Sequence, residues 1–438
     1  MNIQIIKERL EKIKKSLKRD APIVFQHTDI SNISEDEALT RTINQENILY
    51  MKFPKGIKTY IGYGIALKYE INTPEELLNL KNIELNTEHN EDNQKFFLLG
   101  AASFNMETEA SLPWQGYSKG TFYTPKILFS YSKENSYLTY TKLLNKNFST
   151  NDVINEIEEH INLFKSKKPT LNKKKIILSD KQLIPEKEDY IHLAQSIINK
   201  IHRGEIEKTV LARIEKHTVK NEISLYRTIS LLNQKYPNCL NFLIEQKDKN
   251  YFLGSTPEKL IEVKDTKFNT LALAGTSKHK ISLKRDKEVT EHNYVVAHLK
   301  KTLDPYVEEI HVERNAKPLK LDYAYHIQTP IEGQLKEKTH IIDILQNIYP
   351  TPALAGSPMK DSIDIISSIE KFDRGLYGGC VGLFNTEGSG NFYVPIRSAL
   401  IKKNKIYLFS GSGIVEKSVA EKEWDETNLK LEHLKSVL

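Results

Sequence analysis

The class of fold is decided by one stretch, Val381-Gly-Leu-Phe-Asn-Thr-Glu-Gly-Ser-Gly-Asn-Phe-Tyr-Val-Pro-Ile-Arg-Ser-Ala-Leu-Ile-Lys-Lys-Asn-Lys-Ile-Tyr-Leu-Phe409. Three runs in it, at 381–385, 391–400 and 405–409, are rich in the β-branched and aromatic residues typical of strands. The turns between these runs are short and either Gly-rich or polar, which favours direct antiparallel pairing. We therefore expect a meander of neighbouring strands.

The rest of the chain repeats this pattern, with helices between the strands. Apolar periodicity predicts helices at 1–20, 190–202, 225–236 and 284–303, and strands at 208–214, 241–245, 250–254 and in several short segments between 23 and 140. Strand runs with tight turns and interspersed helices favour an antiparallel α+β fold over a parallel, doubly wound sheet. The polar stretch 166–188 is typical of a connector, so we expect a division into residues 1–185 and residues 186–438.

Composition narrows the class of protein. The 438 residues are 39% apolar and 27% charged, as in a globular enzyme with a substantial core. The net charge of +6 is diffuse and Lys-rich, which suits anionic small molecules and gives little support for nucleic acid. Two cysteines exclude a disulfide framework. The N-terminus does not resemble a secretory signal and no apolar run spans a membrane, so we expect a cytoplasmic enzyme.

A predicted C-terminal helix carries the first candidate site. Glu423, Glu426 and Lys430 recur at helical spacing and share one face, beside a mostly apolar stripe that begins at Trp424. Carboxylates at the edge of a buried stripe need a partner, and a divalent cation is a good one. The alternative is an ordinary surface ion pair between Glu426 and Lys430, which contributes little stability.

Two further residues have the chemistry of an acid–base pair. Lys208 begins a short apolar strand, where a lysine can serve as a base, although such lysines more often extend their ammonium groups into water. Glu258 follows the turn Gly254-Ser-Thr-Pro257 and could donate a proton, although a glutamate at the end of a turn is more often simply solvated.

Arg397 and Glu291 leave comparable alternatives open. Arg397 lies in a run that is apolar on both sides, so its guanidinium group needs a partner. That partner is either the carboxylate of a ligand or a structural salt-bridge partner. Glu291 lies on the face of a predicted helix that should be buried, but taken alone it is better explained as an exposed glutamate.

The cluster Gly375-Leu-Tyr-Gly-Gly-Cys-Val-Gly382 does not have the spacing of a dinucleotide-binding loop, and a strand rather than a helix follows it. We attribute these glycines to turns and to the close approach of strands.

Taken together and in order, these segments resemble the chorismate-utilising enzymes, and isochorismate synthases most closely. The matching segments are 204–213, 254–258, 273–276, 291–292, His326, Pro350-Thr-Pro-Ala-Leu-Ala-Gly356, 374–379, 396–399, 411–415 and 423–430. The match covers roughly residues 190–435, whereas the N-terminal half is similar only in character.

The resemblance implies an α+β fold of two antiparallel sheets packed face to face, with outer helices. It also implies Mg²⁺ held by Glu291 and Glu426, Lys208 as the base that activates water, and Glu258 as the acid that protonates the leaving hydroxyl group. Glu423 would support the metal ligands without binding the ion itself. The residues expected to contact chorismate are Leu273, Ala274, Gly275, Thr276, His326, Ala353, Arg397, Gly411, Gly413 and Lys430.

Differences from relatives select the reaction. Aminodeoxychorismate-forming relatives carry a lysine where this chain has Ala274, and anthranilate-forming relatives tend to carry a threonine where it has Ala353. The resemblance therefore implies attack by water and formation of isochorismate, with menaquinone biosynthesis the favoured pathway over siderophore biosynthesis. A salicylate synthase and a catalytically silent chorismate-binding protein remain alternatives. No glutaminase subunit is expected, and a monomer is the simplest expectation.

Overall fold

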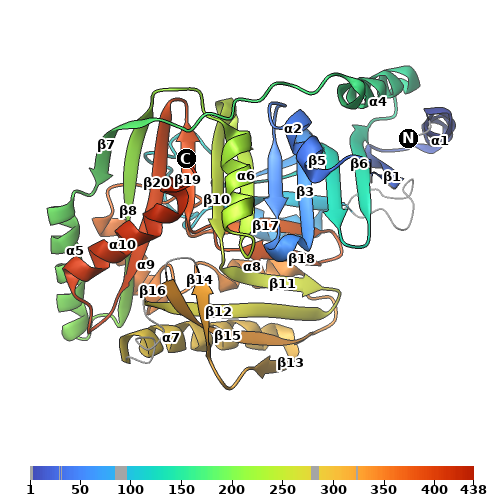
Figure 1. Ribbon diagram of the computed structural model, residues 1–438. Coiled ribbons are helices and arrows are strands. Elements are labelled where there is room, and N and C mark those ends of the chain that lie inside the picture. The colour runs from blue at the N-terminus through green and yellow to red at the C-terminus, as the bar shows by residue number, and fades with distance from the viewer. Residues whose placement is uncertain (1–2, 29, 31, 84–95, 278–285, 322–323) are drawn as a thin grey trace.

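The computed structural model describes residues 3–28, 30, 32–83, 96–277, 286–321 and 324–438, without the side chains of residues 28, 275–277, 286–288, 291, 320–321 and 324. Antiparallel strands with helices on their outer surfaces form the fold (Figure 1). The α-helices are α1 (Ile3–Ser16), α2 (Glu35–Thr42), α3 (Pro74–Asn79), α4 (Thr150–Lys165), α5 (Lys187–His202), α6 (Leu225–Lys235), α7 (Asp286–Leu303), α8 (Ile341–Ile348), α9 (Met359–Ile369) and α10 (Ala420–Lys435).

The strands follow the order of the chain. They are β1 (Ala21–Thr28), β2 (Leu49–Lys52), β3 (Lys58–Ile71), β4 (Phe97–Ala102), β5 (Gly120–Ser132), β6 (Ser136–Leu144), β7 (Leu178–Ile184), β8 (Lys208–Val219), β9 (Leu240–Gln246), β10 (Asn250–Thr256), β11 (Lys259–Lys264), β12 (Lys267–Ser277), β13 (Val307–Val312), β14 (Lys317–Leu321), β15 (Ala324–Leu335), β16 (Gly356–Ser357), β17 (Cys380–Asn385), β18 (Gly390–Tyr393), β19 (Ser398–Lys402) and β20 (Lys405–Ile414).

The strands pair into one connected network with two branches. One branch runs β1–β6–β5–β3–β2–β9–β10–β19–β20–β8, with β7 and β16 also paired to β8. The other runs β5–β4–β17–β18–β11–β12–β15, with β13 and β14 both paired to β15. The antiparallel α+β prediction is therefore confirmed. The finer expectation, two sheets packed face to face, stays a prediction.

The predicted meander is present, but its middle run is interrupted. Residues 391–400 form the end of β18 and the start of β19, separated by residues 394–397. β18 pairs with β11 and β17, whereas β19 pairs with β10 and β20. The chain therefore passes from one branch to the other at 394–397. Arg397, with φ +52°, lies in this break and not within a strand as the sequence suggested.

The chain between the consecutive strands β10 and β11 is interrupted in the same way, at Pro257 and Glu258. β10 pairs with β9 and β19 in one branch, and β11 pairs with β12 and β18 in the other. Two chain segments thus change branch side by side. This double crossing, defined as residues 256–258 and 394–397, is where the candidate site lies.

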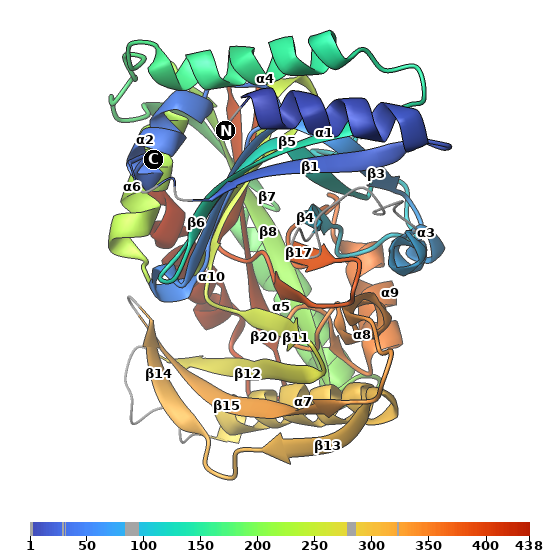
Figure 2. The same ribbon diagram turned by 90° about the vertical axis from the view of Figure 1, so that its right-hand side faces the viewer.

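Helices cover the outer faces of both branches. α10 packs on β20 and α5, and α7 packs on β12 and β15 (Figures 1 and 2). α1 and α4 lie side by side over the N-terminal strands (Figure 2). Within the described residues, no helix is long and apolar enough to cross a membrane. The predicted connector contains β7, whose side chains are exposed or half-buried and whose register with β8 is irregular, so it shows no clear strand alternation.

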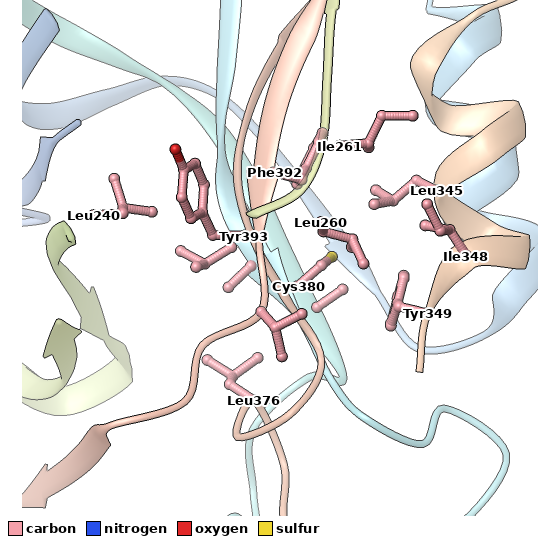
Figure 3. Packing of buried hydrophobic residues seen from close by; sticks show 14 of the residues in the cluster. Leu240, Leu260, Ile261, Leu345, Ile348, Tyr349, Leu376, Cys380, Phe392 and Tyr393 are labelled. Atoms are coloured by element: carbon pink, nitrogen blue, oxygen red, sulfur yellow. The ribbon is translucent and has the colours of Figure 1, made fainter. Parts of the chain in front are cut away.

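The largest hydrophobic cluster joins residues from both halves of the chain. β4 of the N-terminal half pairs with β17 from residue 97 to 102, and Leu99 and Phe122 pack in the same cluster as Val381 and Phe392. Figure 3 shows part of this packing around Cys380, Phe392 and Tyr393. Strand pairing and core packing run across residue 185. The division of the chain at this residue stays a prediction.

Two glycines of the 375–382 cluster, Gly379 and Gly382, are explained by close backbone approach, as predicted. A Cβ atom at Gly379 would lie 2.0 Å from the carbonyl oxygen of Ala102, and one at Gly382 would lie 2.1 Å from that of Asn391. Any side chain there would force neighbouring strands apart.

We therefore expect Gly379→Ala to lower the free energy of unfolding by about 1–3 kcal/mol through overpacking. Urea unfolding followed by circular dichroism measures the change. Gly116→Ala is the control, because no atom lies within 4 Å of the added Cβ atom and only its positive φ opposes the change. Equal losses in the two variants would contradict the close-approach explanation.

Candidate active site

Hydrogen bonds hold the double crossing together. The amide of Val394 donates to the carbonyl oxygen of Glu258 (2.9 Å), and the Thr256 hydroxyl donates to the Val394 carbonyl (2.5 Å). The Ser255 amide donates to the carbonyl oxygen of Arg397 (3.1 Å). Each segment thus fixes the other while both are outside regular strand pairing. Glu258 and Arg397 are in this way held on the wall of the same cavity.

The cavity has about 680 Å³ of empty space, part of it open to solvent. Nine of the predicted site residues line it, namely Glu258, Leu273, Ala274, His326, Ala353, Arg397, Gly411, Gly413 and Lys430. They come from β12, β15, β20, α10, the double crossing and the 350–356 loop. The fold therefore brings together residues that lie up to 172 positions apart in the chain, from Glu258 to Lys430. Their individual roles stay predictions.

Of the other six predicted residues, three have described side chains and are absent from this wall. Lys208, Glu423 and Glu426 are not among the lining residues. Gly275, Thr276 and Glu291 lie outside the residues whose side chains are described.

Lys208 is completely buried at the start of β8, where it pairs with Ser357 of β16. Its side chain points to the same face of the strand as that of Val210, which lines the cavity. Complete burial excludes a lysine that extends its ammonium group into water. Glu258 is 7% exposed, so it is not a solvated turn residue either.

α10 presents its polar face to β20 and the cavity. Lys430 Nζ lies 2.7 Å from Glu426 Oε1 and donates to the Gly411 carbonyl oxygen (2.8 Å). Glu423, one turn earlier, is 1% exposed and accepts a hydrogen bond from Ser412. The predicted pairing of Glu426 with Lys430 therefore exists, but it borders the cavity and is not on an open surface.

The chemistry of this face fits a hard divalent cation. Glu423 and Glu426 supply carboxylate oxygens one turn apart, and Glu426 already has a cationic partner in Lys430. Carboxylate oxygens are the ligands that Mg²⁺ prefers. Among the described residues, no group of three or more His, Cys, Asp or Glu side chains forms a complete metal site. The third predicted carboxylate, Glu291, is not among the described side chains.

The charge around the cavity is mostly positive. Burial, together with the positive charges of Arg397 and Lys430, lowers the pKa of His326 to about 3. His326 is therefore neutral at physiological pH and can act as a neutral hydrogen-bonding group. Arg397 Nη1 donates to the carbonyl oxygen of Lys430 (3.2 Å), which fixes the guanidinium group near α10. This arrangement favours an anionic ligand.

A buried ion pair supports the opposite wall, and the sequence did not suggest it. Arg374 and Glu370 are joined at 2.6 Å and 2.8 Å, with side chains only 2–3% exposed. Arg374 also donates to the carbonyl oxygens of Leu354 and Val210, at 2.7 Å and 2.8 Å. Leu354 and Val210 both line the cavity. Glu370 in turn accepts from the Ala212 amide (2.8 Å), so the pair ties β8 to the 350–356 loop.

Gly356 ends that loop in a conformation that requires glycine. Its φ is +145°, and a Cβ atom would lie 2.2 Å from the Lys208 carbonyl oxygen. The end of the loop therefore packs directly against the backbone of Lys208, with no room for a side chain at Gly356.

Sequence reasoning also missed aromatic lining residues. Tyr377 and Phe409 line the cavity with their rings stacked, with centroids 5.4 Å apart and an interplanar angle of 14°. Burial raises the pKa of Tyr377 to about 12, so its hydroxyl group stays protonated. The position of Tyr377 inside the Gly-rich cluster could have indicated this, because a large side chain among glycines in a closely packed segment stands out as a candidate for lining a site.

Comparison with known proteins matches this arrangement to one family. A family model described as "Chorismate binding enzyme" matches residues 8–438. The chain belongs to the chorismate-binding enzyme family. The match includes the N-terminal half, for which the sequence alone gave only a general similarity.

Curated relatives of this chorismate-binding enzyme include isochorismate synthases. Isochorismate synthase MenF of Bacillus subtilis (strain 168) is 28% identical over 352 residues, which cover 78% of this chain and 74% of that protein. Isochorismate synthase EntC of Escherichia coli (strain K12) is 29% identical over 269 residues, which cover 59% of this chain and 69% of that protein.

Solved structures share the fold. The menaquinone-specific isochorismate synthase MenF from Escherichia coli aligns with a TM-score of 0.81 at 22% identity, covering 100% of this chain and 99% of that one. Anthranilate synthase component I from Streptococcus pneumoniae aligns with a TM-score of 0.72 at 17% identity. The α+β fold is therefore that of the family.

We expect Glu370→Gln to lower the free energy of unfolding by about 3–5 kcal/mol, because Arg374 would be left charged and buried without its partner. Urea denaturation measures this loss. Glu70→Gln, in the exposed pair with Lys68, is the control and should change stability by less than about 1 kcal/mol. A loss at Glu370 no larger than that of the control would show that the pair contributes little.

The lowered pKa of His326 makes a prediction about pH. His326 binds a proton near pH 6.5 in the unfolded chain but only near pH 3 in the folded chain. Its full contribution to the free energy of unfolding is therefore present above pH 6.5 and is lost as the pH falls towards 3. The slope contributed by one such group reaches about 1.4 kcal/mol per pH unit. His326→Asn should remove this contribution, so that its unfolding free energy falls less steeply between pH 6.5 and 5 than that of the wild type. Parallel curves for the two proteins would contradict the assignment.

Proposed function

We propose that this chain is an isochorismate synthase that converts chorismate to isochorismate, with menaquinone biosynthesis as the pathway served. The observation that carries the proposal is the cavity, in which Glu258, Arg397 and Lys430 meet from separate parts of the chain. Membership of the chorismate-binding enzyme family and the isochorismate synthases among the relatives support it.

The substrate fits the charges of the cavity. Chorismate carries two carboxylates, and a planar guanidinium group such as that of Arg397 binds a carboxylate through paired hydrogen bonds. In the proposed arrangement Arg397 and the backbone around Gly411 and Gly413 hold the enolpyruvyl carboxylate. Lys430 and neutral His326 lie close to the other polar groups of the ligand.

The reaction replaces one hydroxyl group by another across the ring. In the proposed mechanism Lys208 accepts a proton from the water that attacks C2, and Glu258 donates a proton to the hydroxyl group that leaves C4. The buried positions of both residues support these roles, because general acids and bases act best where bulk water is excluded. The ring double bonds shift as the C4–O bond breaks, and no external oxidant or reductant is needed.

Mg²⁺ is proposed as the cofactor, held by Glu426 and Glu291 with Glu423 behind them. When bound, the ion would anchor and polarise the ring carboxylate of the substrate. The described part of this set, Glu423 and Glu426 on α10, has the oxygen chemistry that such an ion requires.

The test is incubation of the purified protein with chorismate and Mg²⁺, with products separated by chromatography and an EDTA control. Isochorismate that disappears with EDTA is the expected result. Salicylate and pyruvate would instead identify a salicylate synthase. Unchanged chorismate that nevertheless binds would identify a catalytically silent binder.

Lys208→Ala tests the assignment of the base. We expect kcat to fall by a factor of roughly 10²–10⁴, the usual contribution of general base catalysis, while the dissociation constant for chorismate changes little. Lys216→Ala, on the same strand but partly exposed and bonded to Gln182, is the control and should keep full activity. Full activity in Lys208→Ala would show that another group is the base.

A further inference from the structure

One segment of the N-terminal half lies directly behind the substrate cavity. This segment, residues 103–119, joins β4 to β5 and packs against residues 373–379, which precede β17. The Phe104 amide donates to the Gly375 carbonyl oxygen (2.8 Å), and the Asp373 amide donates to the Leu112 carbonyl oxygen (2.9 Å). Two backbone hydrogen bonds, each between residues more than 250 positions apart in the chain, therefore join the segment to the loop that carries Tyr377.

Charged side chains strengthen this junction. Lys119 Nζ lies 3.0 Å from Asp373 Oδ2, and the two side chains are only 7% and 9% exposed. The other oxygen of Asp373 accepts from the Gly375 amide (2.7 Å). Phe104 lies under the Arg374 guanidinium group, 4.5 Å from its ring centroid. Asp373, Arg374 and Gly375 are thus each held by a residue of the N-terminal half.

Trp114 occupies the centre of the junction. It is 3% exposed, and a Cβ atom at Gly375 would lie 2.3 Å from three of its indole atoms. Gly375 has φ +51°, so it combines a left-handed backbone with direct contact to the indole ring. No residue with a side chain fits at this position.

The indole is also the outer member of an aromatic stack. Trp114 and Phe409 stack with centroids 6.0 Å apart at 24°, and Phe409 and Tyr377 stack at 5.4 Å and 14°. Phe409 and Tyr377 line the cavity, whereas Trp114 is not among the lining residues. Trp114 therefore lies behind the wall and contacts both the stack and the backbone of its loop.

We infer that Trp114 is a positioning residue for the substrate cavity. Its indole fixes the ring of Phe409 and the backbone of Gly375, and through them the ring and hydroxyl group of Tyr377. The N-terminal half thereby contributes to ligand binding without contacting the ligand. The identity of the ligand, chorismate, rests on the proposed function.

The physical reason is the space that the indole fills. A smaller aliphatic side chain would leave a void behind Phe409, and neighbouring groups relax only partly into such voids. The ring could then tilt away from the cavity. A wall displaced by a fraction of an ångström weakens binding strongly, because ligand contacts depend on close fit.

The experiment compares three variants. Trp114→Leu removes the aromatic ring, and Trp114→Phe keeps a ring in the stack as the conservative rescue. Phe129→Leu is the matched control, because Phe129 is also buried, contacts the ring of Phe164 in a tilted arrangement with centroids 4.9 Å apart, and belongs to a different core cluster. All three are assayed with Mg²⁺ at a temperature where circular dichroism shows them folded.

We expect Trp114→Leu to raise the KM for chorismate roughly tenfold with kcat changed much less, the signature of weakened ligand binding. Trp114→Phe should restore most of the affinity, and Phe129→Leu should lower stability without changing KM. Equal KM values in Trp114→Leu and Phe129→Leu would overturn the inference, as would a fall in kcat alone.

A measurement without substrate separates this inference from the proposed function. Hydrogen exchange, followed by mass spectrometry, reports on peptides that cover 373–379 and 407–413. Trp114→Leu should exchange faster than wild type in both peptides, whereas Phe129→Leu should match wild type there. Unchanged exchange in Trp114→Leu would overturn the inference even if the protein forms isochorismate. Faster exchange together with unreacted, unbound chorismate would support the positioning role and reject the proposed ligand.

Discussion

The site depends on one constraint, the double crossing at residues 256–258 and 394–397. There two neighbouring segments of the chain pass side by side from one branch of the strand network to the other. Breaking a strand exposes backbone groups that must find other partners. Here the partners are mutual, since Thr256 and the Glu258 carbonyl bind Val394 while Ser255 binds the Arg397 carbonyl. Because each break supports the other, the chain can place an acid and a guanidinium group between sheet branches instead of along a regular strand.

Buried polar groups hold other parts of the cavity wall in place beside this crossing. Arg374 collects the carbonyl oxygens of Val210 and Leu354, and Glu370 neutralises it while holding the Ala212 amide. Burial of a charged pair is costly unless further hydrogen bonds satisfy it, and these bonds do so. The pair is then better understood as a device that fixes the spacing of two walls than as a source of net stability.

The sequence predicted what depends on local pattern and missed what depends on distant contact. The meander and the C-terminal helix follow from nearby residues, and the local glycine-rich pattern indicated the close approach at Gly379, although its partner Ala102 is distant in the chain. The break at Arg397 did not, because the run around it is apolar throughout and periodicity cannot reveal a left-handed residue within it. Trp114 gave no signal either, since its partners Gly375 and Phe409 lie far along the chain. Nine of the sixteen described lining residues were nevertheless named through family resemblance, which records long-range geometry that pattern alone does not.

The charges of the cavity explain how these parts act together. Lys430 is shared between Glu426 and the Gly411 carbonyl oxygen, while Arg397 donates to the backbone of Lys430. Both cations are therefore anchored to α10 or β20, so their positive field is fixed before any ligand arrives. Burial, with a smaller contribution from that field, keeps His326 neutral, so that it can meet the ligand as a neutral hydrogen-bonding group. An anionic ligand thus meets cations that are already ordered, so that little free energy is lost in ordering them on binding.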